Sequence, residues 1–200
     1  MSLIHLAKSC GFKIIAAHLN YQLRDNESDL DEKLVHDFCK KNEIKLFTKK
    51  VDIDKNIQLE AREARYEFFD EIANKNKCNY IITAHHQNDD HETFLINMIR
   101  GSSIGGLKGI PEKRSNILRP GMCFNKSQLI EYAKFNRVPY REDLSNREDK
   151  YSRNFLRNQI LHPIYQRFKN AENGLTKSMK FIKNEKSILL IMFILFYGIL

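Results

Sequence analysis

The stretch NYIITAHHQNDDHETFLINMIRG, residues 79–101, joins a short strand-like run to a polar cluster and then to a helical segment. Residues 79–84 are rich in aromatic and β-branched side chains, which favours a strand. Residues 92–100 carry apolar side chains at helical spacing, and Gly101 is the expected C-terminal cap. A strand followed by a helix is the repeating unit of parallel α/β sheets.

The same unit occurs twice upstream of this stretch. Residues 13–19 (KIIAAHL) and 45–53 (KLFTKKVDI) have the composition of strands, and residues 27–42 and 58–75 place apolar side chains on one helical stripe each. The order is therefore strand, helix, strand, helix, strand, helix. This alternation predicts an α/β, Rossmann-like parallel sheet with helices on both faces.

Polar residues follow the end of each predicted strand. His18 and Asn20 end the first, Asp52 and Asp54 the second, and His85 and His86 the third; they are joined there by Asp89, Asp90 and Glu92. A solvated surface helix could be equally polar. Because ligands of open α/β sheets collect outside the carboxyl ends of the strands, we interpret the cluster as a site and expect Asp89 to share one edge of the sheet with His18.

Composition limits the classes of protein. A chain of 200 residues with 42% hydrophobic residues can build a packed core. The four cysteines are 29, 39 and 45 residues apart, which excludes a Cys-x-x-Cys pair and a disulfide-rich secreted scaffold and favours a reducing cytoplasm. The first residues lack the basic and apolar regions of a secretory signal.

The positive charge lies in the second half of the chain. Residues 1–99 contain 14 Lys and Arg against 17 Asp and Glu, whereas residues 100–186 contain 19 against 8, a balance of +11. This asymmetry is typical of a protein that binds a polyanion, and a merely soluble basic surface is an equally good explanation of the charge alone.

From residue 100 the character of the sequence changes. Residues 100–116 contain four glycines and a proline and are predicted to be a loop that leaves the sheet, and helices are predicted at 126–138 and 151–168. The second helix places Arg153, Asn154, Arg157 and Asn158 on one side. Guanidinium groups so spaced can grip successive phosphates, and the nearest acidic residues, Glu148 and Asp149, are too few to neutralise them.

We therefore divide the chain into an α/β domain (1–116), a basic helical part that contacts nucleic acid (117–186) and an atypical apolar tail (187–200). The tail, SILLIMFILFYGIL, has no charge, but its 14 residues are short of the ~20 that cross a bilayer. The expectation is a protein without a membrane span.

Five stretches together resemble one family. They are AAHLNYQLRDNESD (16–29), QLEAREARYEFF (58–69), TAHHQNDDHETFL (83–95) with RGSSIGGLKGI (100–110), LRP (118–120) and YREDLSNREDKYSRNFLRNQILHPI (140–164). In this order and spacing, residues 1–170 resemble the catalytic domain of the tRNA(Ile)-lysidine synthases, which are PP-loop ATP pyrophosphatases with an adenine nucleotide alpha hydrolase-like fold.

The resemblance implies a reaction and its participants. An enzyme of this family uses ATP and Mg²⁺ to adenylate the C2 oxygen of the wobble cytidine of tRNA(Ile), with release of pyrophosphate. The ε-amine of free lysine then displaces AMP. The resemblance thus implies ATP and Mg²⁺ as cofactors, tRNA(Ile) and lysine as partners and a cytoplasmic location, and leaves a homodimer open.

The resemblance also assigns residues. In the family's His-His-x-x-Asp element, His85, His86 and Asp89 are the implied catalytic residues, and Asp89 is the expected Mg²⁺ ligand because this hard cation prefers carboxylate oxygens. The two histidines are nearly as well explained as a helix cap and a packing residue. Asn88 and Asp90 depart from the common pattern, which leaves open which carboxylate acts.

Other positions are implied to bind the nucleotide or the RNA. The strand-end element Ala17, His18 and Asn20 would meet the adenine. Arg62 and Arg65 would contact phosphate or, equally, bridge to Glu63 and Glu67 on their own helix. The residues implied to contact tRNA are Arg119, Arg141, Arg153, Asn154 and Arg157.

One family element is not found in this sequence. The Ser-Gly-Gly-x-Asp-Ser loop that cradles the triphosphate does not occur, and residues 1–6 resemble the helix that follows it. The expectation is that this polypeptide alone binds ATP poorly and has little synthase activity. The alternatives are another PP-loop tRNA-modifying or nucleotide enzyme, such as a tRNA thiolase, which the missing Cys-x-x-Cys pairs disfavour, or a non-catalytic remnant that binds tRNA.

Overall fold

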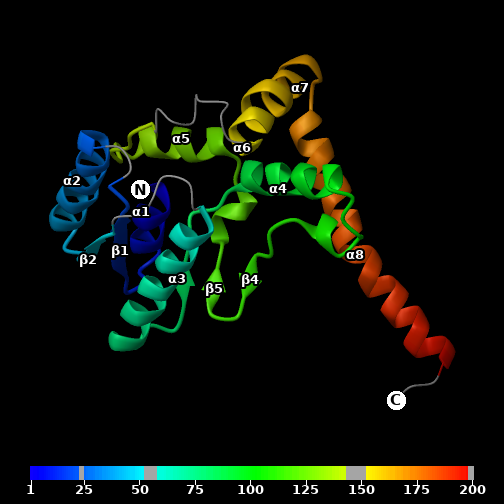
Figure 1. Cartoon of the computed structure of the whole chain (residues 1–200), viewed down its shortest axis with the longest axis horizontal. Helices are drawn as coiled ribbons and strands as arrows, with labels where there is room; N and C mark the ends of the chain where they lie inside the picture. Colours follow the sequence, from blue (N-terminus) through cyan, green and yellow to red (C-terminus); the bar gives the residue numbers. More distant parts are fainter. Residues whose placement is uncertain (23–24, 52–57, 143–151, 198–200) are drawn as a thin grey trace. The chain divides into compact units, whose positions relative to one another are not determined.

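The computed structural model describes residues 1–22, 25–51, 58–142 and 152–197, which are drawn in colour in Figure 1. They form two compact units that alternate along the chain. The first contains Met1–Ala84, Lys113–Leu118 and Ser127–Glu142, and the second contains His85–Glu112, Arg119–Lys126 and Asp143–Leu200. The division into natural domains at residue 116 stays a prediction.

The first unit begins with the predicted alternation of helices and strands. Its elements up to the polar cluster are α1 (Ser2–Ser9), β1 (Ile15–Asn20), α2 (Asp25–Lys41), β2 (Lys45–Lys50), α3 (Gln58–Lys75) and β3 (Ile81–Ile82). Strands β1 and β2 are parallel, with Ile15 opposite Lys45 and Asn20 opposite Lys50. The α/β class with parallel pairing is therefore confirmed. Asp52 and Asp54 lie outside the described residues.

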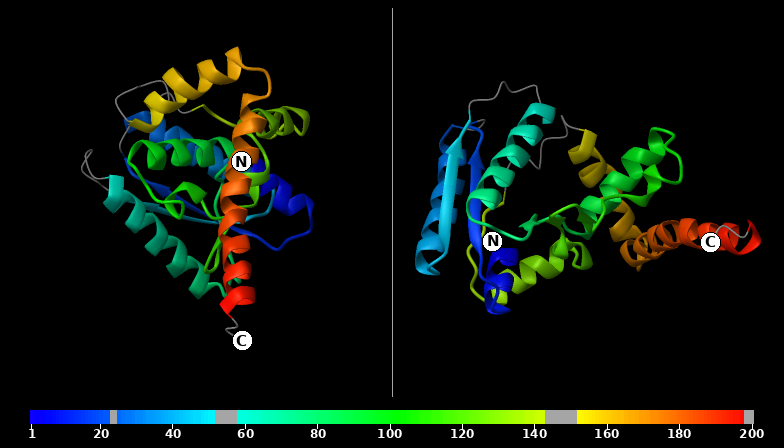
Figure 2. Two further views of the ribbon diagram at one scale, coloured as in Figure 1. Left: turned by 90° about the vertical axis from the view of Figure 1, so that its right-hand side faces the viewer. Right: turned by 90° about the horizontal axis from the view of Figure 1, so that it is seen from below.

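Strand β1 is covered on both faces, as the predicted doubly covered sheet requires. Helices α2 and α3 lie on opposite sides of β1 and β2 (Figure 2). On one side Ala16 packs with Phe38 of α2, and on the other Leu19 packs with Phe68 and Ile72 of α3. This follows from the period-two alternation of side chains along a strand, and it explains why residues 13–19 are apolar almost throughout.

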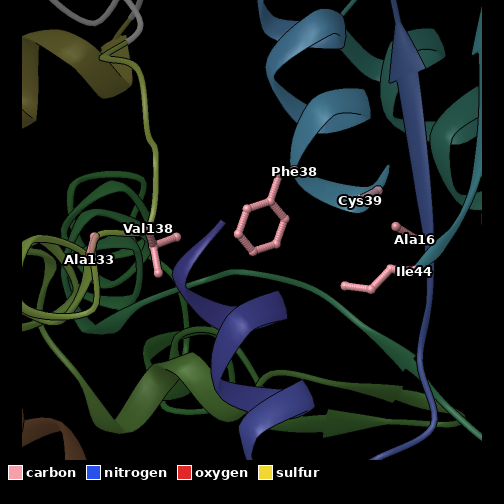
Figure 3. Packing of buried hydrophobic residues seen from close by; sticks show 6 residues of the cluster. All are labelled: Ala16, Phe38, Cys39, Ile44, Ala133 and Val138. Atoms are coloured by element: carbon pink, nitrogen blue, oxygen red, sulfur yellow. The ribbon is translucent and has the colours of Figure 1, made fainter. Parts of the chain in front are cut away.

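The first core cluster also receives α5 (Lys126–Phe135) and the turn after it. Ala133 and Val138 are buried with Ala16, Phe38 and Cys39. Figure 3 shows the ring of Phe38 on the side of α2 that faces Val138. A segment from the second half of the sequence thus completes the core around β1.

The predicted loop at residues 100–116 needs a correction. Its end forms strand β4 (Lys113–Arg114), which turns back into β5 (Ile117–Leu118); β4 and β5 are antiparallel, and β5 is parallel to β3. Ser115 in the turn has a φ of 54°. Strands of two residues are too short to produce a period-two pattern, which is why the sequence does not reveal them.

A small pocket of about 100 Å³ with mainly apolar walls lies within the first unit. Its walls include Ile15 and Ala17 of β1, Phe69 and Ile72 of α3, and Ile81 and Ile82 of β3. In the described residues β1 pairs with β2 and β3 pairs with β5, so the strands form two sheets.

The second unit is mostly helical. It contains α4 (Gln87–Ile99), the 3₁₀ turns η1 (Gly106–Lys108) and η2 (Pro120–Cys123), α6 (Ser152–Phe155), a π-helical turn η4 (Leu156–Leu161), α7 (His162–Arg167) and α8 (Ala171–Tyr197). The helix predicted at 151–168 is present as three consecutive helical segments. Helix α8 was not predicted. In the part of the chain that is described, no helix has the length and apolarity needed to cross a bilayer.

Candidate functional site

The first turn of α4 fixes the polar cluster. His86 is the N-cap: the backbone N–H of Asp89 donates to Nδ1 of His86 at 3.3 Å, and the N–H of His86 donates to Oδ2 of Asp89 at 2.9 Å. This is a capping box in which histidine replaces the usual Ser or Thr. It starts α4 at Gln87, ahead of the apolar residues from which the helix was predicted.

Asp89 is held at one oxygen and faces a cation with the other. Its Oδ1 lies 3.7 Å from Nη2 of Arg157, and its side chain is 17% exposed. The carboxylate is therefore oriented by the capping box and still partly accessible. These properties suit a group that meets a metal ion or a polar substrate.

Glu92, one helical turn beyond Asp89, has a fully buried side chain. Its Oε1 accepts a hydrogen bond from Nε of Arg157 at 2.6 Å, and its Oε2 accepts one from Nη2 of the same residue at 3.1 Å. Nε of Arg153 lies 3.6 Å from Oε2. A desolvated carboxylate requires such a bidentate partner. The resemblance implies no role for Glu92, although its spacing from Asp89 places both on one face of the helix.

Arg153 and Arg157, in the helical segments from residue 152 onward, have more acidic partners than the residues near them in the sequence provide. Arg157 is 26% exposed and is shared between Glu92 and Asp89, and Arg153, 45% exposed, also donates to Oγ1 of Thr93 at 2.8 Å. The counter-charge comes from α4, 65 residues away from Arg157, so the count of neighbouring acidic residues was misleading. The tRNA contacts of Arg153, Asn154 and Arg157 stay predictions.

The two departures from the family pattern have packing roles. Asn88 donates to Oε1 of Glu172 at 2.6 Å and accepts from the N–H of Lys126 at 2.8 Å. Asp90 accepts from the N–H of Ile110 at 2.5 Å and from Nζ of Lys183 at 2.9 Å. Both side chains therefore tie α4 to other parts of its unit, and Asp89 is the carboxylate of this turn that faces Arg157.

The histidines of the cluster differ in their surroundings. Burial lowers the pKa of His86, and the carboxylates of Asp89 and Glu92 offset part of this effect, so the ring is mainly neutral near pH 7. His85 is half-buried, and its carbonyl oxygen would lie 2.6 Å from a Cβ at Gly121. Only glycine fits there without displacing the His85 backbone, a constraint that the sequence alone does not reveal.

A third histidine, His91, is 1% exposed and links three helices. Its Nδ1 lies 2.7 Å from the hydroxyl of Tyr165 in α7, and its Nε2 lies 2.8 Å from Oγ1 of Thr176 in α8. Burial lowers the pKa of His91 to about 4 and raises the pKa of Tyr165 above its usual value. The network is therefore neutral and fixes α4 within its unit.

The residues predicted to meet adenine lie at the end of β1 in the first unit. Asn20 is 3% exposed; its Nδ2 donates to Oε2 of Glu32 at 2.8 Å and its Oδ1 accepts from the N–H of Gln22 at 2.9 Å. Burial lowers the pKa of His18. Ala17 lines the apolar pocket. The structure brings these three together on one strand, and their proximity to Asp89, which belongs to the other unit, stays a prediction.

Arg62 and Arg65 on α3 lie over tyrosine rings. The guanidinium carbon of Arg62 lies 5.1 Å from the ring centroid of Tyr66, and that of Arg65 lies 5.3 Å from that of Tyr21. Nε of Arg65 also donates to the Tyr21 hydroxyl at 2.6 Å. Both arginines are exposed, and their phosphate contact stays a prediction.

Two further arginines of the predicted tRNA set are engaged within the protein. Arg119 is 3% exposed, and its Nη1 donates to the carbonyl of Pro111 at 2.7 Å. Arg141 pairs with Glu27 and with Oδ1 of Asp31, the latter at 3.1 Å. A tRNA phosphate would compete with these partners, and both contacts stay predictions.

The donor set for a metal ion is small. Over the described ranges, no three His, Cys, Asp or Glu side chains gather in a group that could hold a metal ion. Mg²⁺ in nucleotide enzymes needs one or two carboxylates, with phosphate oxygens and water as the other ligands. Asp89 fits this lesser requirement, since it is a partly exposed oxygen donor.

Several relatives of this chain carry the same name. Proteins named tRNA(Ile)-lysidine synthase are 34% identical to this chain over 176 residues in Oceanobacillus iheyensis, 35% over 179 in Chlorobaculum tepidum and 38% over 180 in Clostridium tetani. The alignments cover 80%, 84% and 84% of this chain. The chain spans 38%, 54% and 38% of these relatives.

A solved structure supports the same fold. The U34-tRNA thiolase NcsA from Methanococcus maripaludis, described with its 4Fe-4S cluster, superposes with a TM-score of 0.69 over 90% of this chain and 66% of the thiolase. At 12% identity this likeness concerns the fold alone.

A family profile described as a PP-loop domain matches residues 1–164. Because the match covers most of the 200 residues, the chain belongs to the PP-loop domain family.

Proposed function

We propose that the native protein is a tRNA(Ile)-lysidine synthase that acts in the cytoplasm. The observation that carries this proposal is the 34–38% identity to relatives of that name over at least 80% of the chain. The region aligned includes Asp89 and Arg157, which lie beside each other, and the fully buried carboxylate of Glu92, which accepts from Arg157. The substrates would be ATP, tRNA(Ile) and free lysine.

The reaction has two steps, adenylation of the cytidine and displacement of AMP by lysine. The C2 oxygen of the wobble cytidine attacks the α-phosphorus of ATP, and pyrophosphate leaves. The ε-amine of lysine then attacks C2, the bond to the adenylate oxygen breaks, and AMP leaves with the proton of the amine transferred to solvent or a base. Negative charge develops on phosphate oxygens in the first step, so cations and oriented N–H groups lower the barrier.

Asp89 would hold Mg²⁺, which supplies Lewis-acid stabilisation of the phosphates when it is bound. The capping box supports this role because it fixes the carboxylate without covering it. Glu92 would act as a positioning residue: its two bonds to Arg157 hold that guanidinium beside Asp89. His85 and His86 would position the loop that enters α4.

Ala17, His18 and Asn20 would contact the adenine, and Arg62 and Arg65 the phosphates. Of the predicted tRNA contacts, Arg153 has the best support, because it is 45% exposed and its partner Glu92 is already satisfied by Arg157.

The test is ATP-dependent transfer of labelled lysine to a tRNA(Ile) transcript by the native full-length protein. We expect label in the RNA only when ATP and Mg²⁺ are present, and none in a transcript whose wobble cytidine is replaced by uridine. An Asp89→Asn variant should transfer lysine more slowly and need more Mg²⁺ to reach half of its own maximal rate. Asp37→Asn, at a 62% exposed side chain on α2, is the matched control and should act as the wild type.

Transfer of lysine without ATP, or the absence of any transfer by the wild-type protein, contradicts the proposal. Full activity of the Asp89→Asn variant would show that Asp89 has no role in the reaction and would not contradict the proposed function.

A further inference from the structure

The described side chains of α8 divide into a packed side and an exposed side. On the packed side Glu172 accepts hydrogen bonds from Asn88 and from Asn125, Thr176 meets His91, and Lys183 pairs with Asp90. Met179 on the same side is 2% exposed. These contacts hold the helix at several points along its length and fix which side faces solvent.

The exposed side carries an aromatic ring among lysines. Phe181 is 73% exposed, and Lys177 and Lys180 are exposed as well. Lys177 lies four residues before Phe181, which places both on one face of the helix one turn apart, and Lys180 is the adjacent residue. Single exposed phenylalanines are common on protein surfaces. Phe181 has one lysine on its own face and a second lysine next to it along the chain, on a helix that several side-chain contacts hold in place.

The charges of this segment favour an anionic partner. Glu172 lies on the packed side, so the cations dominate the exposed one. In the sequence, residues 100–186 hold 19 Lys and Arg against 8 Asp and Glu. A ligand that complements both features presents negative charge beside a flat aromatic surface, and an unpaired nucleotide does so. A duplex presents its phosphates but keeps its bases stacked, so it would leave Phe181 without a partner.

We propose that the exposed side of α8, formed by Lys177, Lys180 and Phe181, binds an unpaired segment of RNA. A base stacks on the ring of Phe181, and the flanking phosphates lie near the two lysines. The proposal rests on the proposed function in taking that RNA to be a loop of tRNA(Ile), and it adds a second contact region that is separate from the Asp89 cluster.

The experiment measures binding of the native full-length protein to two RNAs: the anticodon stem-loop of tRNA(Ile), and the same stem as an uninterrupted duplex. Phe181→Ala should weaken binding of the stem-loop about 5-fold to 150-fold, the range that corresponds to loss of one stacked base. Phe181→Tyr keeps a ring and should bind within about twofold of the wild type. Phe181→Leu keeps apolar bulk without a ring and should behave as Phe181→Ala does.

The lysines are tested through salt dependence. Lys177→Gln and Lys180→Gln should each reduce the slope of log affinity against log salt by about 0.7, the value for one single-strand phosphate contact. Two variants are matched controls: Phe12→Ala, at a ring that is 66% exposed in the other unit, and Lys41→Gln, at an exposed lysine on α2. Neither should change stem-loop binding. Unchanged melting temperatures would show that all variants fold.

Three results would overturn the proposal: wild-type binding by Phe181→Ala, wild-type binding by Phe181→Leu, or equal losses for the duplex and the stem-loop. The second would indicate that Phe181 packs against protein. The outcome is independent of lysine transfer. If the native protein transfers no lysine but Phe181→Ala weakens loop binding, the proposed function is wrong and the RNA contact is supported. If the native protein transfers lysine but Phe181→Ala binds the loop as the wild type does, the RNA contact is wrong and the proposed function is supported.

Discussion

Substitution of Arg157 by glutamine should lower the free energy of unfolding by far more than substitution of an exposed arginine on a basic helix would. The change removes both hydrogen bonds to Glu92, whose side chain is fully buried, and leaves the charge with Arg153, which is 3.6 Å away and 45% exposed. Removing one partner of a buried ion pair costs about 3–5 kcal/mol. Because domains are stable by only about 5–15 kcal/mol, the loss is a large fraction of the total.

The assay is urea unfolding at pH 7 followed by far-ultraviolet circular dichroism. Arg141→Gln is the matched control: its partners Glu27 and Asp31 are 45% and 41% exposed, so it should cost about 0–1 kcal/mol. The double variant Glu92→Gln, Arg157→Gln removes the buried carboxylate at position 92 together with its partner and should be more stable than Arg157→Gln alone by at least about 1 kcal/mol. Equal stability of the Arg157 and Arg141 variants, or additive losses in the double variant, would refute the reasoning.

Three further substitutions test the packing within each of the two units. Because the pKa of His91 is about 4 in the folded protein, the unfolded state takes up its proton first, so the free energy of unfolding should fall by about 3 kcal/mol between pH 6.5 and 4. His91→Gln should remove this component, while His36→Gln, at a 61% exposed side chain, should keep it. Gly109→Ala, at φ +67°, would put a Cβ 2.1 Å from Oδ1 of Asp90 and should cost about 1–3 kcal/mol in thermal unfolding. Tyr21→Phe loses the bonds to the Ala61 carbonyl and to Arg65 and should cost about 1 kcal/mol in urea unfolding, whereas no change would show that solvent replaces them.

The elements with long apolar patterns could be predicted from the sequence. Residues 58–75 form the predicted helix α3, and the strands at 13–19 and 45–53 are present within a few residues as β1 and β2, since side-chain periodicity is a local property. The strands β4 and β5 were not predicted because each has two residues and is stabilised by pairing with a strand far away in the sequence.

The candidate site was predicted in part for the same reason. The placement of His85, His86 and Asp89 directly after β3 follows from the order of strand and helix. The partners of Arg157 could not be found, because Glu92 is remote in sequence and only the fold brings the two together. Likewise, nothing local distinguishes Arg119, which is buried, from Arg153, which is half-exposed.

The capping box at the start of α4 links helix initiation to the chemistry proposed for Asp89. The N–H of His86 and the carboxylate of Asp89 form the bond that initiates the helix, and the same bond selects the rotamer of the carboxylate. Fraying of this single turn would release Asp89 to other rotamers while most of α4 stays helical. A substitution that only weakens helix initiation should therefore be detected as lost turnover at temperatures where the protein is still fully folded.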